Sequence, residues 1–376
     1  GVVILEDVRI AEGRTLATGT MVSAASVVIR YDLRGLLGGQ GAGAISRVEV
    51  VRPHLSLVRR RDGSLNVSAL FKRPPGPPGP PFTGIVHVTG GTVLFQDYLG
   101  APPTKPTIAH VRGVDAAIDA AGYPRYEFRV TAAGRQGEFT AAHVVGVYDS
   151  AAAVARMDVR ATGLNAPFAA LHFRVPGDIR LLDGTLRLAL GVTLRRIDSR
   201  WATALTGVVA VKEVDALIPR ISAPVRDVTG NVILTRDQAA MSLTGDFAGS
   251  PVRVTGTVTD LRRPRLDILV ASRTARFAGA IEAVGFLSSL RVVGLHGSGP
   301  LEIRITGPTS NPTILVSATI PRATYRGYLA ENVTLEVRYR AGVLDLRFVR
   351  ARIAGGTVVA SGIVKTNGVP VLDIRG

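Results

Sequence analysis

The sequence predicts an all-β protein, mainly antiparallel, with a few short helices. Three observations lead to this fold class. Apolar and polar residues alternate with a period of two over many segments, as in Leu301–Thr306 (LEIRIT). Turn-forming residues recur about every ten positions. Gly (42) and Pro (22) are plentiful in a chain of 376 residues that is 46% hydrophobic. About 12 residues for each strand and its turn predict some 25 strands.

The alternation gives each strand one apolar and one polar face, which is typical of an antiparallel sheet with one side in water. In Val343–Arg350, for example, Leu344, Leu346 and Phe348 alternate with Asp345 and Arg347. We expect one apolar set in the C-terminal half to share a face and to form its ligand-binding surface. This set comprises Val252, Val254, Val258, Leu301, Ile303, Ile305, Val333, Leu335, Val337, Leu344, Leu346 and Phe348.

Two segments near the C-terminus repeat one pattern, namely strands joined by glycine-containing turns. They are Asp227–Val258 and Asn332–Val364. Asp227 aligns with Asn332, and Ala248-Gly249 aligns with Ala354-Gly355 after one inserted residue. Internal repetition of this kind predicts a repetitive β architecture.

Four regions are expected along the chain. An N-terminal β region covers 1–73, a Pro/Gly-rich loop covers 74–81, and two sets of β repeats cover 82–220 and 221–376. The loop follows from the sequence RPPGPPGPP at 73–81. That segment is too short for a collagen helix and is typical of a polyproline II connector.

Turns and helices complete the expected element order. Turns are expected at Asp62-Gly63, Gly90-Gly91, Asp183-Gly184, Ala341-Gly342, Gly355-Gly356 and Asn367-Gly368, and a strand end at Ser310-Asn311-Pro312. Short helices are expected at Ala166–His172, where Pro167 suits the first turn, at Val211–Ile218 before Pro219, and at Phe277–Leu290. We expect them to cover the sheet, because nothing indicates regular βαβ alternation.

The net charge of +16 comes from 45 basic and 29 acidic residues. Most arginines occupy the polar positions of alternating strands, where solvation of the sheet explains them. The alternative is attraction to anionic surfaces such as phosphate or lipid headgroups. The chain has no cysteine, which excludes disulfides, zinc knuckles and thiol catalysis.

The usual signatures of catalysis and of cofactor binding are missing from the sequence. The six histidines never fall in metal-ligand spacing, and no nucleophile elbow, HExxH motif or Walker loop occurs. Gly39–Ala44 matches a loose G-x-G-x-x-A string, but the strand pattern of Ile45–Val51 follows it where dinucleotide binding needs a helix. We therefore expect no enzyme, no cofactor and no metal. Few aromatics lie beside the arginines, so nucleic-acid binding is not expected either.

No segment approaches the ~20 apolar residues of a membrane-spanning helix. The chain begins and ends within strand patterns, at Gly1–Leu5 and Val369–Gly376. The sequence therefore favours a piece of a longer protein, with any export signal or membrane anchor outside it.

Several short elements follow one another in an order that resembles the AsmA-like proteins, including the TamB branch of the translocation and assembly module. The residues that carry the resemblance are Val50, Pro53, Leu55, Leu57, Asp62, Gly63, Asn66, Gly91, Val93, Phe95 and Asp97. Farther on, Ile303–Pro312 and Gly355–Gly362 are similar to two further elements of the family. The membrane anchor of that family is missing here, which leaves the family branch open.

The resemblance implies a long twisted sheet that curls into an open hydrophobic groove, in a periplasmic protein tethered to the inner membrane. It also implies a non-enzymatic role in moving phospholipid between the inner and outer membranes or in outer-membrane assembly. Phospholipid acyl chains would be the ligand, and an outer-membrane assembly protein a further partner. A structural or adhesive surface β-repeat protein, with both faces of the sheet packed, is the alternative.

Overall fold

The computed structural model describes residues 1–13, 15–69, 79–99, 105–173, 179–197, 200–219, 221–261, 263–283, 295–325, 327–365 and 371–375. Within them the protein is all-β and mostly antiparallel, as predicted, with 21 strands. The chain forms two compact units. The first unit holds Gly1–Phe173 with Arg187–Gly207, and the second holds Arg174–Leu186 with Val208–Gly376.

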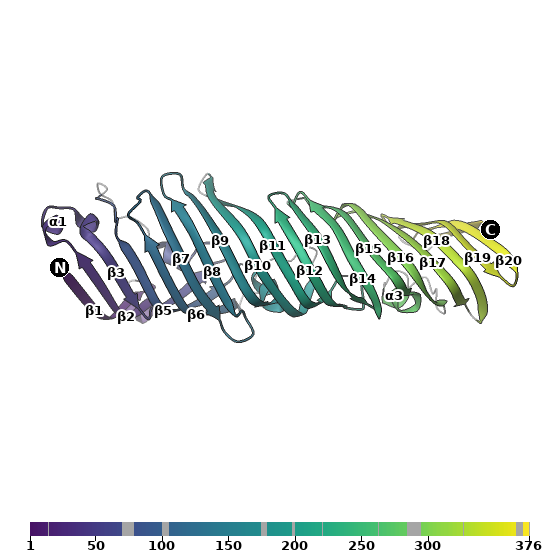
Figure 1. Ribbon diagram of the computed structural model, residues 1–376, viewed down its shortest axis with the longest axis horizontal. Helices are drawn as coiled ribbons and strands as arrows, with labels where there is room; N and C mark the ends of the chain where they lie inside the picture. Colours follow the sequence, from purple (N-terminus) through teal and green to yellow (C-terminus); the bar gives the residue numbers. More distant parts are fainter. Residues whose placement is uncertain are drawn as a thin grey trace. The chain divides into compact units, whose positions relative to one another are not determined.

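Figure 1 labels the elements along the chain. The strands up to residue 165 are β1 (Val2–Ala11), β2 (Thr20–Tyr31), β3 (Ile45–Val51), β4 (His54–Arg59), β5 (Ile85–Asp97), β6 (Thr107–Asp119), β7 (Arg125–Gly134), β8 (Ala141–Asp149) and β9 (Val154–Asn165). The next are β10 (Arg180–Ile197), β11 (Arg200–Leu217), β12 (Val225–Thr235), β13 (Gln238–Phe247), β14 (Ser250–Thr259) and β15 (Arg265–Arg276). The last are β16 (Leu295–Pro308), β17 (Thr313–Tyr325), β18 (Tyr328–Arg340), β19 (Val343–Ile353), β20 (Gly356–Lys365) and β21 (Val371–Arg375). The helices are α1 (Leu33–Leu37), α2 (Ala166–His172) and α3 (Phe277–Ala283), with single 3-10 turns η1 (Leu16–Thr18), η2 (Gly41–Ala44) and η3 (Asn66–Ala69).

In the first unit, one strand position is shared by β3 and β4. Both pair antiparallel with β2 and parallel with β5, and Arg52 and Pro53 interrupt them. Each strand from β5 to β9 then pairs antiparallel with the next. The segment 74–81 lies between β4 and β5, so hydrogen-bonded strands of one unit flank it. Its residues 74–78 lie outside the described part of the chain.

In the second unit, each strand from β12 to β21 pairs antiparallel with the next. The repeat predicted from sequence has a backbone basis. Ala248-Gly249 (φ 51° and 76°) and Ala354-Gly355 (φ 49° and 83°) are both two-residue turns with positive φ at each position. This is the turn geometry whose twist suits a hairpin. Asp227 and Asn332 match as well, since both have positive φ near the start of a strand (53° and 49°).

Two expected turns are instead irregular positions inside long strands. Gly90-Gly91 shifts the pairing register within β5, and Gly184 lies inside β10 with a φ of 104°. Glycine adopts positive φ inside an irregular strand as readily as in a tight turn, so its presence does not distinguish the two. The prediction of turns there is wrong, and the strands are fewer and longer than expected.

The prediction of a helix at Val211–Ile218 is also wrong, because residues 211–217 belong to β11. The valines of this segment suit a pleated surface, and a two-turn helix in isolation has little stability. The other two expected helices form where predicted, and α1 is a helix that the sequence pattern did not predict. Asn165 caps α2 by accepting a hydrogen bond from the Phe168 amide (2.9 Å), and α3 covers the first part of Phe277–Leu290. Residues 284–290 lie outside the described part.

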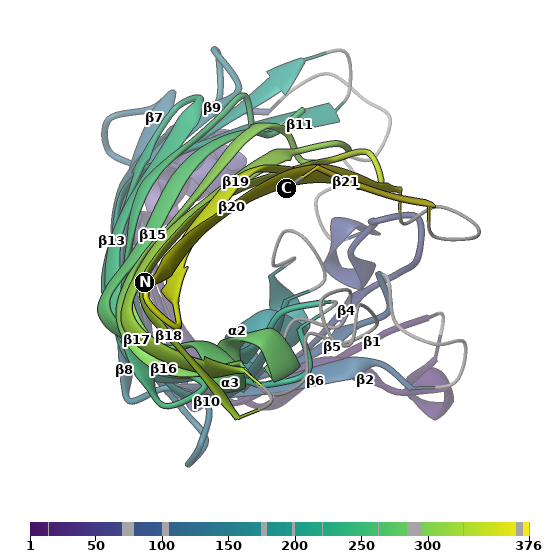
Figure 2. The same cartoon turned by 90° about the vertical axis from the view of Figure 1, so that its right-hand side faces the viewer.

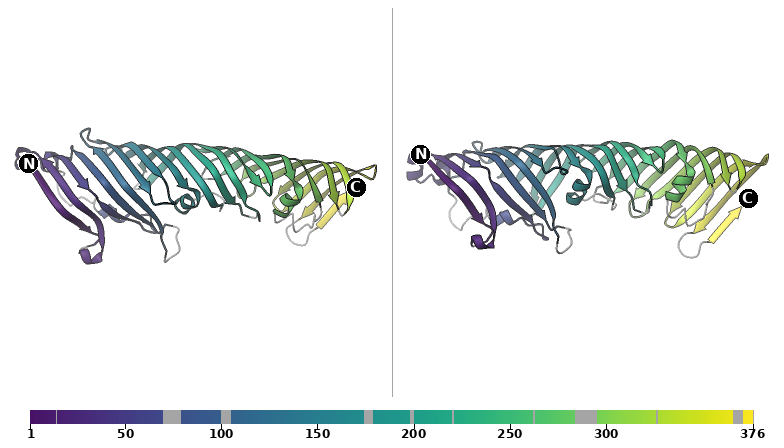
Figure 3. Two further views of the ribbon diagram at one scale, coloured as in Figure 1. Left: turned by 60° about the horizontal axis from the view of Figure 1, so that its bottom comes forward. Right: turned by 90° about the horizontal axis from the view of Figure 1, so that it is seen from below.

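The strands of each unit form a curved sheet. Viewed along the strands' stacking direction, α2 and α3 lie on the inside of the curve of their own unit (Figure 2). Figure 3 shows the two helices, in teal and green, beside the strands of similar colour. We call the face that carries the helix the inner face of that unit and the opposite face the outer face.

Candidate functional site

The inner face of the second unit is an apolar surface that crosses seven strands without interruption. Residues directly opposite each other in a β ladder share a face. One row, followed from β13 to β19, consists of Leu243, Val254, Val270, Ile303, Val316, Val337 and Leu346. A parallel row consists of Ile268, Ile305, Ile314, Tyr339, Leu344 and Val364. Most of these side chains are only partly buried.

The structure brings nearly all of the predicted set to this face. Val254, Ile303, Val337 and Leu346 belong to the first row. Ile305 and Leu344 belong to the second row, and Leu301 and Leu335 lie in a third row on either side of Ala318. Val252, Val258 and Val333 share the face because they alternate in phase with these residues along β14 and β18.

Phe348 is the exception, and its expected orientation is wrong. Val337 pairs with Leu346 whereas Glu336 pairs with Phe348, so Arg347 is an extra residue in β19. A bulge of this kind shifts the alternation by one position. Phe348 therefore lies on the outer face beside Glu336, 41% exposed, and Val349 takes the inner position opposite Leu335.

Helix α3 covers one edge of this inner face. Phe277 joins a buried cluster with Ala318, Ile320 and Val333, and Ile281 packs against that cluster. Leu301 and Leu335 also contact it, so these two and Val333 contribute to the unit's own core. The rows through Ile303 and Ile305 lie outside the cluster. Except for the buried Leu344 and Val364, their side chains are partly exposed, so they are the part of the face open to a ligand.

The first unit repeats the arrangement with different residues. A row of small and branched apolar side chains crosses from β1 to β9. It consists of Leu5, Val27, Val50, Val88, Ala116, Val130, Val144 and Val159. The bulge at Gly90 shifts the alternation within β5, so Val88 and Phe95 share the face on which α2 lies. All members of the row are partly exposed or, for Leu5, exposed.

This second set of inner-face residues is not among those predicted from the sequence. Period-two alternation is present in β7 (RYEFRVTAAG), so Phe128 and Val130 could have been found. The rest of the row depends on the parallel pairing of β3 and β5 and on bulges that reverse the phase. Neither feature has a local sequence signal that fixes it.

The accessible surface of the chain is large for its mass. It amounts to 23458 Å² for 39.5 kDa. Two separate globular domains, each of half this mass, would together expose about 17,000 Å². Ile320 is the one large apolar side chain in the described part that is fully buried, and many other core residues are alanines. The excess is what a single layer of strands produces when little covers its apolar face.

At the α2 end of the first unit, the buried carboxylate of Asp97 pairs with the partly exposed guanidinium of Arg59. Asp97 is only 2% exposed, and Arg59 Nε donates to its Oδ1 at 2.8 Å, with a second contact to Oδ2. The Leu99 amide also donates to Asp97 Oδ1 (2.8 Å). The guanidinium lies 5.7 Å from the Phe95 ring centre, and the His172 ring of α2 lies 6.1 Å from the same ring.

These contacts shift the pKa values of Asp97, Arg59 and His172. The hydrogen bond from Arg59 lowers the pKa of Asp97 below its usual range, against the effect of burial, and the same bond raises the pKa of Arg59. Burial lowers the pKa of His172, although Asp97 and Glu138 oppose this shift. Both His172 ring nitrogens are buried and make no hydrogen bond of full geometry among the described residues, although the Ile108 backbone lies close enough to oppose the lowering of the His172 pKa. His172 therefore packs as a neutral ring against Phe168 (4.7 Å).

The polar residues that carry the family resemblance have structural roles. Asn66 is 5% exposed and bridges two backbone groups of β4, accepting from the Val58 amide (2.9 Å) and donating to the Ser56 carbonyl (2.8 Å). Asp62 accepts from the Ser64 amide (2.8 Å) in the turn that precedes η3. They hold the β4–η3 segment in place, and nothing in their geometry indicates catalysis.

The outer face is polar, and ion pairs between neighbouring strands lie on it. In the second unit, Arg304 pairs with Asp267 (3.2 Å) and Arg338 with Asp345 (2.8 Å). The bulge residue Arg347 pairs with Glu336 (2.8 Å). Exposed pairs of this kind contribute little to stability, and their effect is to keep this face in water.

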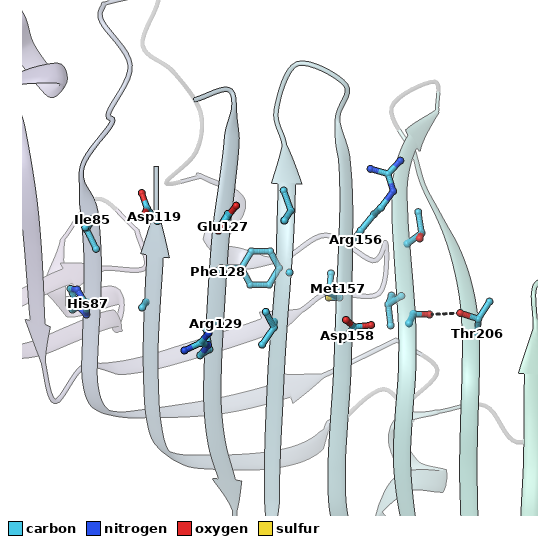
Figure 4. A pocket seen from close by; sticks show the side chains of 17 residues that line it. Ile85, His87, Asp119, Glu127, Phe128, Arg129, Arg156, Met157, Asp158 and Thr206 are labelled. Atoms are coloured by element: carbon cyan, nitrogen blue, oxygen red, sulfur yellow. Dashed lines mark hydrogen bonds between the residues drawn. The ribbon is translucent and has the colours of Figure 1, made fainter. Parts of the chain in front are cut away.

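A shallow depression of about 740 Å³ lies on the outer face of the first unit (Figure 4). Most of its side chains come from positions that alternate with the inner row, whereas Phe128 and Met157 are in phase with that row. The ionisable residues of the lining are His87, Asp119, Glu127, Arg129, Arg156 and Asp158. Among the described residues, no three histidine or carboxylate side chains lie close enough to hold a metal ion. The depression shows no arrangement of acid, base and nucleophile.

Comparison of the chain with family models, curated proteins and solved structures finds no match. None of the helices that the structure describes has both the length and the apolar character to cross a membrane. The candidate functional site is therefore defined by the chain's own geometry. It is the apolar inner face, repeated in each unit.

Proposed function

We propose that the chain is a non-enzymatic module that binds phospholipid acyl chains along its inner face and supports phospholipid transfer between two membranes. The observation that carries the proposal is the unbroken apolar row on each unit's inner face, together with the excess accessible surface. The resemblance to AsmA-like and TamB proteins supports the same role. It also makes the periplasm of a cell with inner and outer membranes the proposed location.

The chemistry of the two faces suits a lipid. Each methylene of an acyl chain that leaves water contributes about 0.8 kcal/mol, so a dozen of them contribute on the order of 10 kcal/mol. An aliphatic surface without hydrogen-bonding groups can bind such a chain in any position along the row, because the hydrophobic effect is non-directional. The headgroup stays in water at the edge of the sheet. No bond is broken, so the proposed function requires no catalytic residue.

Adjacent residues of β14 provide a matched test. Val254 lies on the inner face opposite Val270, and Thr255 lies on the outer face opposite Leu269. The variants Val254→Glu and Thr255→Glu add the same charge to the same strand. We expect the first to lose phospholipid that co-purifies with the chain, measured by native mass spectrometry, and the second to keep it. Circular dichroism and the melting temperature of each variant control for folding.

A second pair extends the test to β18. Val337 lies in the inner row, whereas Arg338 is on the outer face. A photo-crosslinking amino acid at position 337 should attach to lipid, and the same amino acid at 338 should not. Equal crosslinking at both positions, or wild-type chain free of lipid after isolation from its host, would contradict the proposal. Those results would favour the structural or adhesive β-repeat protein.

A further inference from the structure

The most exposed large apolar side chain of the described part belongs to α1, in the connection between β2 and β3 (Figure 1). Leu37 is 80% exposed, and Leu33 and Leu36 of the same helix are 52% and 45% exposed. Their spacing of three and four residues places all three on one face of the helix. We call Leu33, Leu36 and Leu37 the leucine tip.

The opposite face of α1 is fixed to the unit. Gly35 is buried, and a Cβ there would come within 2.6 Å of Gln40 Oε1 and 3.3 Å of the Ala44 Cβ. Asp32 caps the helix by accepting from the amides of Arg34 (3.2 Å) and Gly35 (3.1 Å), and its own amide donates to the Ala44 carbonyl (2.8 Å). These contacts hold the leucines outward, so their exposure follows from the packing of the helix.

Beside the tip, the three arginines Arg30, Arg34 and Arg47 outnumber the carboxylates of Asp32, at the helix N-cap, and Glu49. Arg34, within α1, has no acidic partner among the described residues. Arg30 and Arg47 lie opposite each other where β2 and β3 approach the helix, and they share the single carboxylate of Glu49 (3.8 and 3.4 Å). The local charge is therefore positive, which complements an anionic headgroup layer.

The area of the tip distinguishes a bilayer from a protein partner. The three leucines expose on the order of 200–300 Å² of apolar surface. A stable protein interface, including one between two copies of this chain, buries roughly 800 Å² on each side. A bilayer needs no such area, because a few apolar side chains enter the headgroup region while basic neighbours contact the phosphates.

From these observations we infer that the leucine tip inserts into the surface of an anionic bilayer and docks the first unit on the membrane. The inference extends the proposed function and rests on it, because it assumes that the inner face takes up acyl chains from a membrane. A face that takes up acyl chains needs contact with the membrane that supplies them. The tip itself is defined by the exposure of its leucines, by the arginines beside it and by the contacts that fix α1 to the unit.

Flotation with vesicles of phosphatidylethanolamine and phosphatidylglycerol tests the inference. The wild-type chain should float with the vesicles, and the double variant Leu36→Ser/Leu37→Ser should bind at least about tenfold less. The control is Ile233→Ser/Leu261→Ser, which removes apolar side chains that are 50% and 46% exposed in the second unit. It should float like the wild type. Arg34→Glu should weaken binding to these vesicles and leave the weaker binding to phosphatidylcholine unchanged.

A spectroscopic measurement reports insertion directly. The chain has one tryptophan, so Leu37→Trp in a Trp201→Phe background gives a single reporter at the tip. Its emission should shift to the blue with vesicles and be quenched by brominated lipid. Unshifted emission, or full flotation of the serine variant, would overturn the inference. A change in the oligomeric mass of the serine variant, without vesicle binding by the wild type, would assign the tip to a second copy instead.

Failure of the inference and failure of the proposed function are distinguishable. The serine variant should still bind a short-chain phospholipid supplied below its critical micelle concentration, because the inner face is intact. Val254→Glu should lose that binding and still float. If the serine variant loses both, the tip acts on the fold and the docking inference is wrong.

Discussion

At the residue scale, the least exposed charge in the described part of the chain is Asp97 under α2. A carboxylate in that position is stable only with its partners, namely the Arg59 guanidinium and the Leu99 amide. These contacts fasten β4 to β5 at the place where α2 covers the sheet. The anchor is structural, and its removal should affect stability before it affects ligand binding.

Asp97→Asn should lower the free energy of unfolding by about 2 kcal/mol, because a neutral amide replaces the buried carboxylate that accepts the charge-assisted hydrogen bonds of Arg59. Denaturant unfolding followed by circular dichroism measures the loss. Asp345→Asn is the matched control, since the ion pair of Asp345 with Arg338 is more exposed. It should change stability by less than about 1 kcal/mol. Equal losses for the two variants would refute the role of Asp97.

The pH dependence of the α2 contact follows from His172. Its pKa is lowered in the folded protein, chiefly by burial, so the folded state binds protons less readily than the unfolded state. The packing of the neutral ring therefore contributes stability above the ordinary histidine pKa of about 6.5, and this contribution is lost as the pH falls through the lower folded value. The nearby charges are Asp97, Glu138 and Arg59, and Asp97 stays ionised in this range.

We expect the melting temperature of the wild-type chain to fall between pH 7.5 and pH 5.5. In His172→Phe, which keeps an aromatic ring beside Phe168, the fall should be smaller. Differential scanning calorimetry at several pH values measures the difference. An identical pH profile for the variant would show that other groups cause the dependence.

At the element scale, positive-φ positions determine where strands turn, bend or change phase. Glycine and asparagine tolerate this backbone region, and a β-branched side chain does not. Asn332 (φ 49°) illustrates the point, because its side chain is exposed and packing does not obscure the backbone effect. The same requirement explains Asp227 in the matching position of the repeat.

Asn332→Val should therefore destabilise the second unit by about 1–2 kcal/mol, whereas Asn332→Gly should leave its stability nearly unchanged. Thr334→Val, two residues farther along β18 at an ordinary strand position, is the control and should be neutral. Urea denaturation of the three variants tests the difference. If Asn332→Val is as stable as the wild type, residue 332 does not require positive φ and the strand can be regular at this position.

These positions also explain the limits of sequence prediction for the elements. Gly184 and the Gly90-Gly91 pair give the signal of a turn, but Gly184 and Gly90 have positive φ inside long strands. Only the neighbouring strand decides between a turn and an irregular strand. The helical pattern of Val211–Ile218 was overridden in the same way, since pairing within a sheet stabilises an extended segment more than a short helix stabilises itself.

At the scale of the whole molecule, the apolar surface is distributed in one layer per unit, with little core beneath it. A globular chain of this hydrophobic content would bury its large aliphatic side chains, whereas here the inner-face valines and isoleucines stay partly exposed. A ligand that binds this surface in the folded state alone must stabilise the fold through mass action.

Addition of a short-chain phospholipid to lipid-depleted chain should therefore raise its melting temperature. At a free concentration of 100 times the Kd, the expected stabilisation is about 2.7 kcal/mol. Val254→Glu should abolish the increase, and Thr255→Glu should retain it. A melting temperature that does not respond to lipid in the wild type would exclude acyl chains as the ligand of the inner face.

The sequence by itself determined the all-β class, the two-faced strands, the helices α2 and α3 and most of the apolar set of the second unit. These features depend on alternation and capping within a few residues, which local chemistry fixes. The tertiary structure alone decided that Phe348 faces outward, that the first unit carries a matching row, and that α1 presents three leucines outward. Each depends on pairing, bulges or packing between distant segments, so no local pattern determines them.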